Sequence, residues 1–315
     1  MLIDAGNNDK GTLVQNYLQH QGVETLDYVI GTHPDADHIG GMDVVLYKFD
    51  CKTIIMPDVA NNTRTYDDVV QTMKNKGYKT TYPVVGETYT IGGAAFTIIA
   101  PNKEYGNDMN SWSVGVLLQN GNHRFLFTGD AEEGAEQDIL QNGIDISADV
   151  YKVAHHGSNT ATSQAFLDAV HPTYAVISAG EGNSYGHPHA EVLNRLRAAG
   201  VSVFRTDEQG TIVAASDGTT LTWNMSPSES WQAGEAEKSQ NTEKSEKAAD
   251  NQNNAETDAA VSNPTDQTDG NSDVIVHITK TGEKYHSAGC QYLRQSDIEV
   301  TLSEAKAKGL TQIGR

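Results

Sequence analysis

Short apolar runs alternate with segments of helical spacing from residue 6 to residue 225, which is the rhythm of a mixed α/β domain. The run 28–32 predicts a strand, and apolar residues recur across 40–49 at the spacing of one helix face. The same alternation predicts a strand at 150–154 and a helix at 163–170. We therefore expect one large α/β domain that occupies most of the chain.

A hairpin is predicted in the middle of this domain. The apolar runs 114–118 and 124–128 flank the turn N-G-N, which is a strong signal for two antiparallel strands. The second run leads directly into Gly129 and Asp130. An acidic residue is therefore expected at the end of a buried strand.

The alternating pattern stops after the domain, which we place at residues 1–225. Residues 226–275 contain eleven Asp or Glu and three Lys, a net charge of −8, with Trp231 as the single aromatic residue. Such a segment cannot bury enough apolar surface to offset the entropy lost on ordering. We assign 226–273 to a disordered acidic linker, and 274–315 to a small C-terminal α+β module.

The formal net charge of the whole chain is −20 at pH 7. This charge argues against a long groove that follows nucleic-acid phosphates, because nonspecific affinity comes from Lys and Arg that displace counterions. A nucleic-acid substrate would have to be held by metal ions. No apolar run reaches eighteen residues, so no membrane span is predicted. Met1 is followed by L-I-D-A-G, which is typical of the end of a buried strand, and we expect preceding strands to be missing.

The two cysteines do not form a metal or disulfide framework. Cys51 and Cys290 fall in different predicted domains, so neither domain can build a disulfide framework or a four-cysteine zinc site. His286 lies close to Cys290, but the chain ends in T-Q-I-G-R without further cysteines. We expect no metal in this module, interpret it as truncated, and expect it to bind a surface or a protein partner.

Candidate metal ligands gather after the strand at 28–32. The sequence T-H-P-D-A-D-H-I-G-G places four ligand side chains within six residues. In a loop, His33 and Asp35 can face one point while Asp37 and His38 face a second. This suits two divalent ions about 3.5 to 4 Å apart, and His with Asp suits zinc, manganese or iron. Asp37 could instead cap the next helix, but a cap does not need four such residues.

Two metal ions need more ligands, and further candidates follow later strands. Asp130 in F-L-F-T-G-D-A could bridge both ions, or it could cap the following helix. H-H-G-S at 155–158 and H-P-H at 187–189 add histidines. Six of the eleven histidines fall in three such loops, which chance placement on the surface does not explain.

Together, the motifs T-H-P-D-A-D-H-I-G-G, L-F-T-G-D-A, K-V-A-H-H-G-S and Y-G-H-P-H resemble the metallo-hydrolase domain of the ComEC competence proteins. The resemblance covers residues 1–225 and implies a metallo-β-lactamase αββα sandwich without the N-terminal strands that the family normally has. It implies a first metal ion held by His33, Asp35, Asp130 and His156. It implies a second metal ion held by Asp37, His38, Asp130 and His187.

Roles for other residues also follow from the resemblance. Catalysis would use a metal-bound hydroxide, since a divalent ion lowers the pKa of water, and Asp37 would help to orient it. The role of His155 stays open: it could orient His156, contact a phosphate or replace His156 as a ligand. Contacts with the substrate or with the ligands are assigned to Asn110, Ser113, Ser158 and His189.

The function implied by this resemblance is hydrolysis of DNA or another phosphodiester, with two zinc or manganese ions as cofactors. Hydrolysis of a β-lactam or of an ester is one alternative, and Asp35 in place of a histidine disfavours the β-lactam. A noncatalytic extracellular binding module with structural metals is the other. The free-standing domain with its polar tail resembles secreted or lipid-anchored relatives, so we expect an extracytoplasmic location.

Overall fold

The computed structural model describes residues 1–234, 275–278, 284–286, 298–301 and 311–312. The chain divides into two compact units, Met1–Thr242 and Glu243–Arg315. From residue 235 onward the predicted linker lies outside the described residues, as does the helical part of the predicted module. None of the helices in the described residues is long and apolar enough to cross a bilayer.

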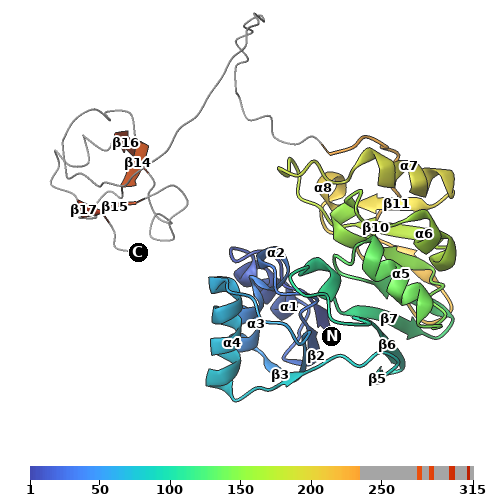
Figure 1. Cartoon of the computed structure of the whole chain (residues 1–315), viewed down its shortest axis with the longest axis horizontal. Helices are drawn as coiled ribbons and strands as arrows, with labels where there is room; N and C mark the ends of the chain where they lie inside the picture. Colours follow the sequence, from blue (N-terminus) through green and yellow to red (C-terminus); the bar gives the residue numbers. More distant parts are fainter. Residues whose placement is uncertain (235–274, 279–283, 287–297, 302–310, 313–315) are drawn as a thin grey trace, which may run out of the picture. The chain divides into compact units, whose positions relative to one another are not determined.

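The first half of the larger unit forms a parallel sheet in the order β1-β2-β3-β4 (Figure 1). Its strands are β1 (Leu2–Ile3), β2 (Thr25–Ile30), β3 (Asp50–Ile55) and β4 (Thr80–Thr81). The helices of this half are α1 (Gly11–His20), α2 (Ala36–Ile39), α3 (Met42–Lys48) and α4 (Arg64–Lys76). Apolar residues of α1, α3 and α4 share one buried cluster with this sheet, so these helices cover its outer face.

The second half forms a seven-stranded sheet in the order β11-β10-β9-β8-β7-β6-β5. Its strands are β5 (Thr88–Ile91), β6 (Ala94–Ala100), β7 (Gly115–Asn120), β8 (His123–Phe127), β9 (Val150–Lys152), β10 (Tyr174–Ile177) and β11 (Ser202–Arg205). Strands β5 to β8 run antiparallel, and β8 to β11 run parallel. Helices α5 (Glu133–Gln141), α6 (Gln164–Val170) and α7 (Ala190–Ala198) bury their apolar residues in the cluster on the outer face of this sheet.

A third apolar cluster joins the inner faces of the two sheets. Ile30 and Ile55 from the first sheet are fully buried together with Phe96 and Ile98 from the second. The layers therefore follow the order helix, sheet, sheet, helix, and the expected αββα sandwich is confirmed. A sandwich of this kind brings the ends of β2, β8 and β9 to a common edge, where the polar loops emerge.

The hairpin predicted at N-G-N is confirmed, since β7 pairs antiparallel with β8 and Asn120 faces His123. The helix predicted over 40–49 differs in detail. The chain enters a first short helix, α2, already at Ala36, and breaks it at Gly40 and Gly41 before α3. The predicted metal motif therefore includes a helical turn as well as a loop.

The remaining strands and a short helix follow the second sheet along the chain. A turn of helix α8 (Thr206–Gln209) follows β11, and β12 (Ala214–Ser216) pairs with β13 (Leu221–Trp223). In the second unit the strand order is β16-β14-β15-β17. These strands are β14 (Ile275–Ile278), β15 (Lys284–His286), β16 (Ile298–Thr301) and β17 (Thr311–Gln312).

Residues 226–234, which the sequence analysis assigned to the linker, pack on the larger unit. The Ser228 amide donates to the Val203 carbonyl at 2.7 Å, and the Gly234 amide donates to the Pro188 carbonyl at 2.9 Å. Trp231 packs against the outer cluster of the second sheet. Because the segment has low hydrophobicity, its sequence did not indicate that Trp231 would pack on the domain.

Candidate metal centre

The loop after β2 carries the first group of ligands. His33 is buried, and Asp35 adopts an extended backbone directly before α2, so Asp37 and His38 lie on the first turn of that helix. Glycine is sterically required at Gly40 and Gly41, where the helix breaks. A Cβ atom on Gly41 would overlap the carbonyl oxygen of Ala5. The glycines thus allow the chain after β1 to pack closely against α2.

Asp130 enters the site from the end of β8. Gly129 has a φ of +54°, and a Cβ atom there would approach the Ser113 hydroxyl to 2.7 Å. The Ser113 hydroxyl accepts a hydrogen bond from the Asp130 amide at 2.9 Å. Ser113 therefore holds the backbone that directs Asp130 into the centre.

His155 and His156 follow β9 in an unusual backbone conformation. Their φ angles are +47° and +55°, in the left-handed region that residues other than glycine rarely adopt. Such strained residues gather at functional sites. The His155 amide donates to the Gly129 carbonyl at 3.1 Å, which ties this turn to the end of β8.

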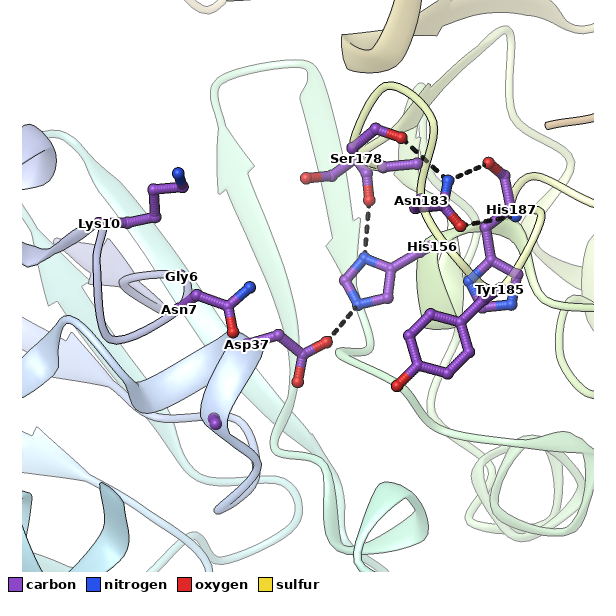
Figure 2. Close-up of a pocket in the computed structure, with 12 residues that line it drawn as sticks. Gly6, Asn7, Lys10, Asp37, His156, Ser178, Asn183, Tyr185 and His187 are labelled. Carbon is purple, nitrogen blue, oxygen red and sulfur yellow. Dashed lines mark hydrogen bonds and ion pairs between the residues drawn. The ribbon is translucent and has the colours of Figure 1, made fainter. Parts of the chain in front are cut away.

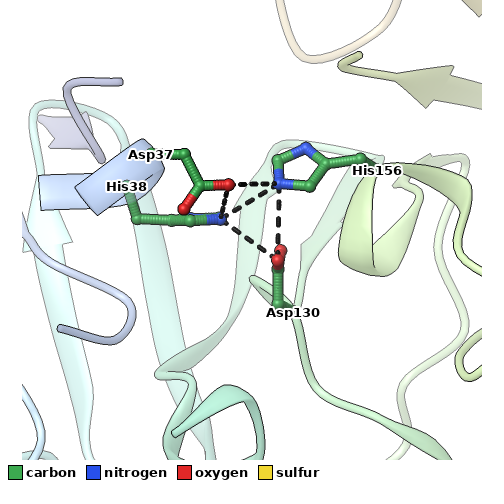
Figure 3. Close-up of side chains that lie close together, drawn as sticks. All are labelled: Asp37, His38, Asp130 and His156. Carbon is green, nitrogen blue, oxygen red and sulfur yellow. Dashed lines mark hydrogen bonds and ion pairs between the residues drawn. The ribbon is translucent and has the colours of Figure 1, made fainter. Parts of the chain in front are cut away.

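Four side chains from these elements converge on one point (Figure 3). Nε2 of His38 and Nε2 of His156 lie 3.2 and 3.3 Å from Oδ2 of Asp130. Nε2 of His156 also lies 3.4 Å from Oδ2 of Asp37. One ligand atom from each of the four residues lies within 4.8 Å of the other three. Two imidazoles and two carboxylates in this arrangement form a set that divalent ions such as zinc bind.

Outer hydrogen bonds orient both imidazoles of this cluster. Nδ1 of His38 lies 2.7 Å from Oδ2 of Asp4, and Nδ1 of His156 lies 2.7 Å from the Ser178 carbonyl oxygen. When Nδ1 carries the proton that these acceptors require, Nε2 presents its lone pair to the centre. Metal-binding histidines in proteins have this kind of outer partner, so the residues fit a metal ion.

The charges of the cluster support the same conclusion. Burial acts to raise the pKa of Asp130, but His38 and His156 hold this pKa well below its ordinary value. Burial acts to lower the pKa of His156, but hydrogen bonds to Asp130 and Asp37 raise it to about 9. In the metal-free protein the histidine protons thus neutralise the carboxylates. A divalent cation can take over that role.

His33 and Asp35 lie beside this cluster. Nε2 of His33 is buried without a hydrogen-bond partner in the described residues, and Oδ2 of Asp35 lies 3.8 Å away. Burial, and next the charge of His38, lowers the pKa of His33 to about 4, so this imidazole is neutral near pH 7. A buried neutral nitrogen without a partner fits coordination to a second cation.

The structure groups His156 differently from the ligand sets that the resemblance implied. His156 lies with Asp37 and His38, whereas it was expected beside His33 and Asp35. The left-handed backbone at this turn and the Ser178 carbonyl direct its ring toward α2. Nε2 of His155 also approaches Oδ2 of Asp130, at 3.8 Å, but Nε2 of His156 is closer, at 3.3 Å. The choice among the three roles left open for His155 stays a prediction.

His187 is not part of the four-residue cluster. Its ring stacks at an interplanar angle of 20° on His156, with 6.3 Å between the ring centroids. Burial, and next His189, lowers the pKa of His187 to about 4. Its role as a metal ligand stays a prediction.

Most of the residues assigned to contacts with the substrate or with the metal ligands form hydrogen bonds within the loops around the centre. The Asn110 amide donates to Glu132 at 3.2 Å. The Ser158 hydroxyl lies 3.0 Å from the Thr160 hydroxyl, and Nδ1 of His189 accepts from the Asn159 amide at 3.0 Å. Only Ser113 contacts the ligands themselves, because its hydroxyl lies 3.4 Å from Nδ1 of His33 as well as bonding the Asp130 amide.

Sequence reasoning missed Asp4 as a site residue. Its carboxylate accepts hydrogen bonds from the Thr32 amide and hydroxyl, each at 2.8 Å, in addition to its contact with His38. A signal was present, because Asp4 directly follows the apolar pair Leu2 and Ile3, and Asp130 likewise comes just after an apolar run. The run in front of it is short, and this weakened the pattern.

A cleft of about 510 Å³ opens beside the cluster (Figure 2). Asp37 and His156 lie between its two sides, with Lys10 on one side and Tyr185 and His187 on the other. Its volume falls within the range of roughly 300 to 1,000 Å³ that is usual for ligand sites. Asp37 and His156 are therefore accessible from solvent through this cleft.

A family model for the metallo-beta-lactamase superfamily matches residues 1–181. This chain belongs to the metallo-β-lactamase superfamily. The family fold implies divalent metal ions, and the cluster of Asp37, His38, Asp130 and His156 lies where strand-end loops of that fold meet.

Curated relatives include competence and recombination proteins. ComE operon protein 3 of Bacillus subtilis is 33% identical over 62% of this chain and 25% of its own length. Recombination protein 2 of Haemophilus influenzae is 31% identical over 67% of this chain and 26% of its own length. The chain thus spans about a quarter of the length of these relatives.

The chain also has weak similarity to solved structures, at low sequence identity. The structure of Tm1679, described as a metal-dependent hydrolase of the β-lactamase superfamily, is 10% identical with a TM-score of 0.43 over 64% of this chain and 84% of that chain. A metal-dependent hydrolase from Parabacteroides distasonis, described as putative, is 18% identical with a TM-score of 0.39 over 61% of this chain and 81% of that chain.

Proposed function

We propose that this superfamily member is a binuclear metal-dependent hydrolase that cleaves phosphodiester bonds, with DNA as its substrate. The observation that carries the proposal is a pair of adjacent ligand groups, the first of which contains Asp130. Asp37, His38, Asp130 and His156 form one group. His33 and Asp35, with the buried and unpartnered Nε2 of His33, form the other. The similarity to competence and recombination proteins supports DNA.

Each group would hold one zinc or manganese ion, and Asp130 would contact both. Bound divalent ions lower the pKa of water and stabilise the negative charge that develops on a phosphate during hydrolysis. Asp4 and the Ser178 carbonyl hold His38 and His156 in the orientation that ligation requires. His155, whose ring faces Asp130, is placed to contact the substrate phosphate or to complete the second group.

When no metal is bound, the protons of His38 and His156 balance only two negative charges, whereas the centre has four carboxylates. Asp4, Asp35, Asp37 and Asp130 all lie in or beside it. A phosphodiester carries a negative charge and is repelled by uncompensated carboxylates. Metal ions are therefore required for substrate binding as well as for catalysis. This also explains how a chain with a net charge of −20 can act on an anion.

The test is hydrolysis of bis(p-nitrophenyl) phosphate by the chelator-treated protein after addition of zinc or manganese. We expect turnover only with metal, and at least a hundredfold loss in Asp130→Ala, because both groups lose their shared ligand. Asp50→Ala is the matched control, since Asp50 is exposed and begins β3, whereas the ligand loop follows the far end of the neighbouring parallel strand β2. Metal content is measured in each variant.

Absence of metal-dependent turnover in the wild-type protein would overturn the hydrolase proposal in favour of a noncatalytic binding module. Full activity and two bound metals in Asp130→Ala would contradict the assignment of the bridging ligand. Turnover of a β-lactam but not of the phosphodiester would indicate that the protein is a β-lactam hydrolase instead. Secretion or lipid anchoring stays a prediction that none of these assays addresses.

A further inference from the structure

The loop between β10 and α7 presents an aromatic surface to the cleft. Tyr185 is 74% exposed, the most exposed of the large apolar side chains in the described residues. Its ring stacks on His187 at an interplanar angle of 20° and a centroid distance of 5.6 Å. His187 in turn stacks on His156. An exposed ring is thus held against a row of rings that leads to the metal ligands.

Hydrogen bonds organise this loop. The Asn183 side chain accepts from the His187 amide at 2.9 Å and donates to the Gly180 carbonyl at 2.9 Å. Nδ2 of Asn183 also donates to the His187 carbonyl at 2.6 Å. Nε2 of His189 lies 3.2 Å from the Tyr185 carbonyl oxygen. Tyr185 therefore has an ordered backbone although its ring faces solvent.

The two sides of the cleft differ in chemistry (Figure 2). Tyr185 and His187 make one side aromatic, whereas Asn7 and Lys10 give the other side amide and ammonium donors. The Lys10 ammonium also contacts the exposed Asp9 at 2.7 Å, so its charge is partly compensated. A ligand that fills this cleft beside the metal cluster needs a flat ring on one side and an anionic or polar group on the other.

We propose that Tyr185 is a stacking platform for an unpaired nucleobase next to the phosphate that is cleaved, and that the substrate is single-stranded nucleic acid. The neighbouring backbone then lies toward Asn7 and Lys10. Proteins that bind single strands combine aromatic rings with donors to the backbone, and each stacked base contributes substantially to affinity. A base inside a duplex has no free face for Tyr185 unless it leaves the helix. This inference rests on the proposed phosphodiesterase function.

The experiment compares two ligands on the full chain in the presence of manganese. One is a fluorescently labelled oligothymidylate with phosphorothioate linkages, and the other is the same backbone without bases. Fluorescence anisotropy gives the two dissociation constants. We expect the wild-type protein to bind the strand with bases about 5- to 100-fold more tightly. Tyr185→Ala should abolish this difference, whereas Tyr185→Phe should preserve it because the ring remains.

Tyr82→Ala is the matched control, since Tyr82 is also exposed but does not line this cleft. Photocrosslinking with a 5-bromodeoxyuridine strand gives a second readout, with the expected crosslink in the peptide that contains Tyr185. An unchanged ratio of dissociation constants in Tyr185→Ala overturns the inference. So does equal affinity of the wild-type protein for the oligothymidylate and for its duplex with oligodeoxyadenylate, measured by the same anisotropy assay. Hydrolysis of bis(p-nitrophenyl) phosphate tests the parent proposal separately, so the two failures are distinguishable.

Discussion

At the scale of single residues, the candidate centre depends on side chains that orient the ligands. Nδ1 of His38 contacts Asp4, and Nδ1 of His156 contacts the Ser178 carbonyl. Each contact fixes one ring nitrogen and leaves the other for a metal ion. The affinity of the site for metal should therefore depend on residues that do not touch the ion.

Asp4→Asn tests this dependence. The amide keeps the size of the side chain but removes the charge that balances His38, so we expect the affinity for zinc to fall about 10- to 100-fold. Competition with a fluorescent chelator measures the change. Asp9→Asn is the control, because Asp9 is an exposed acidic residue in the same part of the chain. Equal zinc affinity in wild type and Asp4→Asn would contradict the role of Asp4.

At the scale of elements, short helices and tight turns bring the strand ends together. α2 has only four residues, and the two glycines after it let the chain that follows β1 pack against it. Neither Gly40 nor Gly41 has a positive φ. The requirement for glycine here is thus one of space, and not of backbone conformation.

Gly41→Ala should therefore lower the free energy of unfolding by about 1–3 kcal/mol, the usual cost of overpacking a well-packed region. The added methyl group would overlap the Ala5 carbonyl and crowd Gly11. Gly134→Ala is the opposite control, because nothing lies within 4 Å of its Cβ position in α5. That change should stabilise the protein by up to about 1 kcal/mol. Urea denaturation of both variants measures these effects, and equal midpoints would refute the steric argument.

At the scale of the whole molecule, the chain after β13 packs back onto the domain. Arg205 is 2% exposed, pairs with Asp207 at 2.6 Å and donates to the Gln232 carbonyl. Trp231 lies on the outer cluster with the Arg197 guanidinium 5.6 Å from its ring centroid. Residues 226–234 therefore complete the larger unit, although their composition resembles that of a linker.

Trp231→Ala decides whether this segment contributes to stability. Loss of the partly buried ring should cost about 1–3 kcal/mol, less than for a fully buried tryptophan. Trp231→Phe should retain most of the stability because an aromatic ring still covers the cluster. Thermal unfolding followed by circular dichroism measures both variants. A melting temperature of Trp231→Ala equal to that of wild type would support the original linker interpretation.

The sequence by itself determined the elements and the location of the centre. Hydrophobic periodicity depends on near neighbours, so it predicted the alternating strands and helices and the hairpin at N-G-N. Four candidate ligands lie within residues 33–38, and a strand end precedes each later candidate. These are local features, and the αββα fold places strand ends at one edge. The family resemblance added the assignment of ligands to particular ions.

Only the tertiary structure decided which side chains meet. His38 and His156 are 118 positions apart, yet their Nε2 atoms lie 3.2 Å from each other. The left-handed backbone at His155 and His156 brings both rings toward Asp130, and it brings the ring of His156 to Asp37 on α2 as well. No local pattern encodes this direction, because it follows from contacts with β8 and with Ser178. Asp4 and Tyr185 gained their proposed roles for the same physical reason: each depends on neighbours that are distant in sequence.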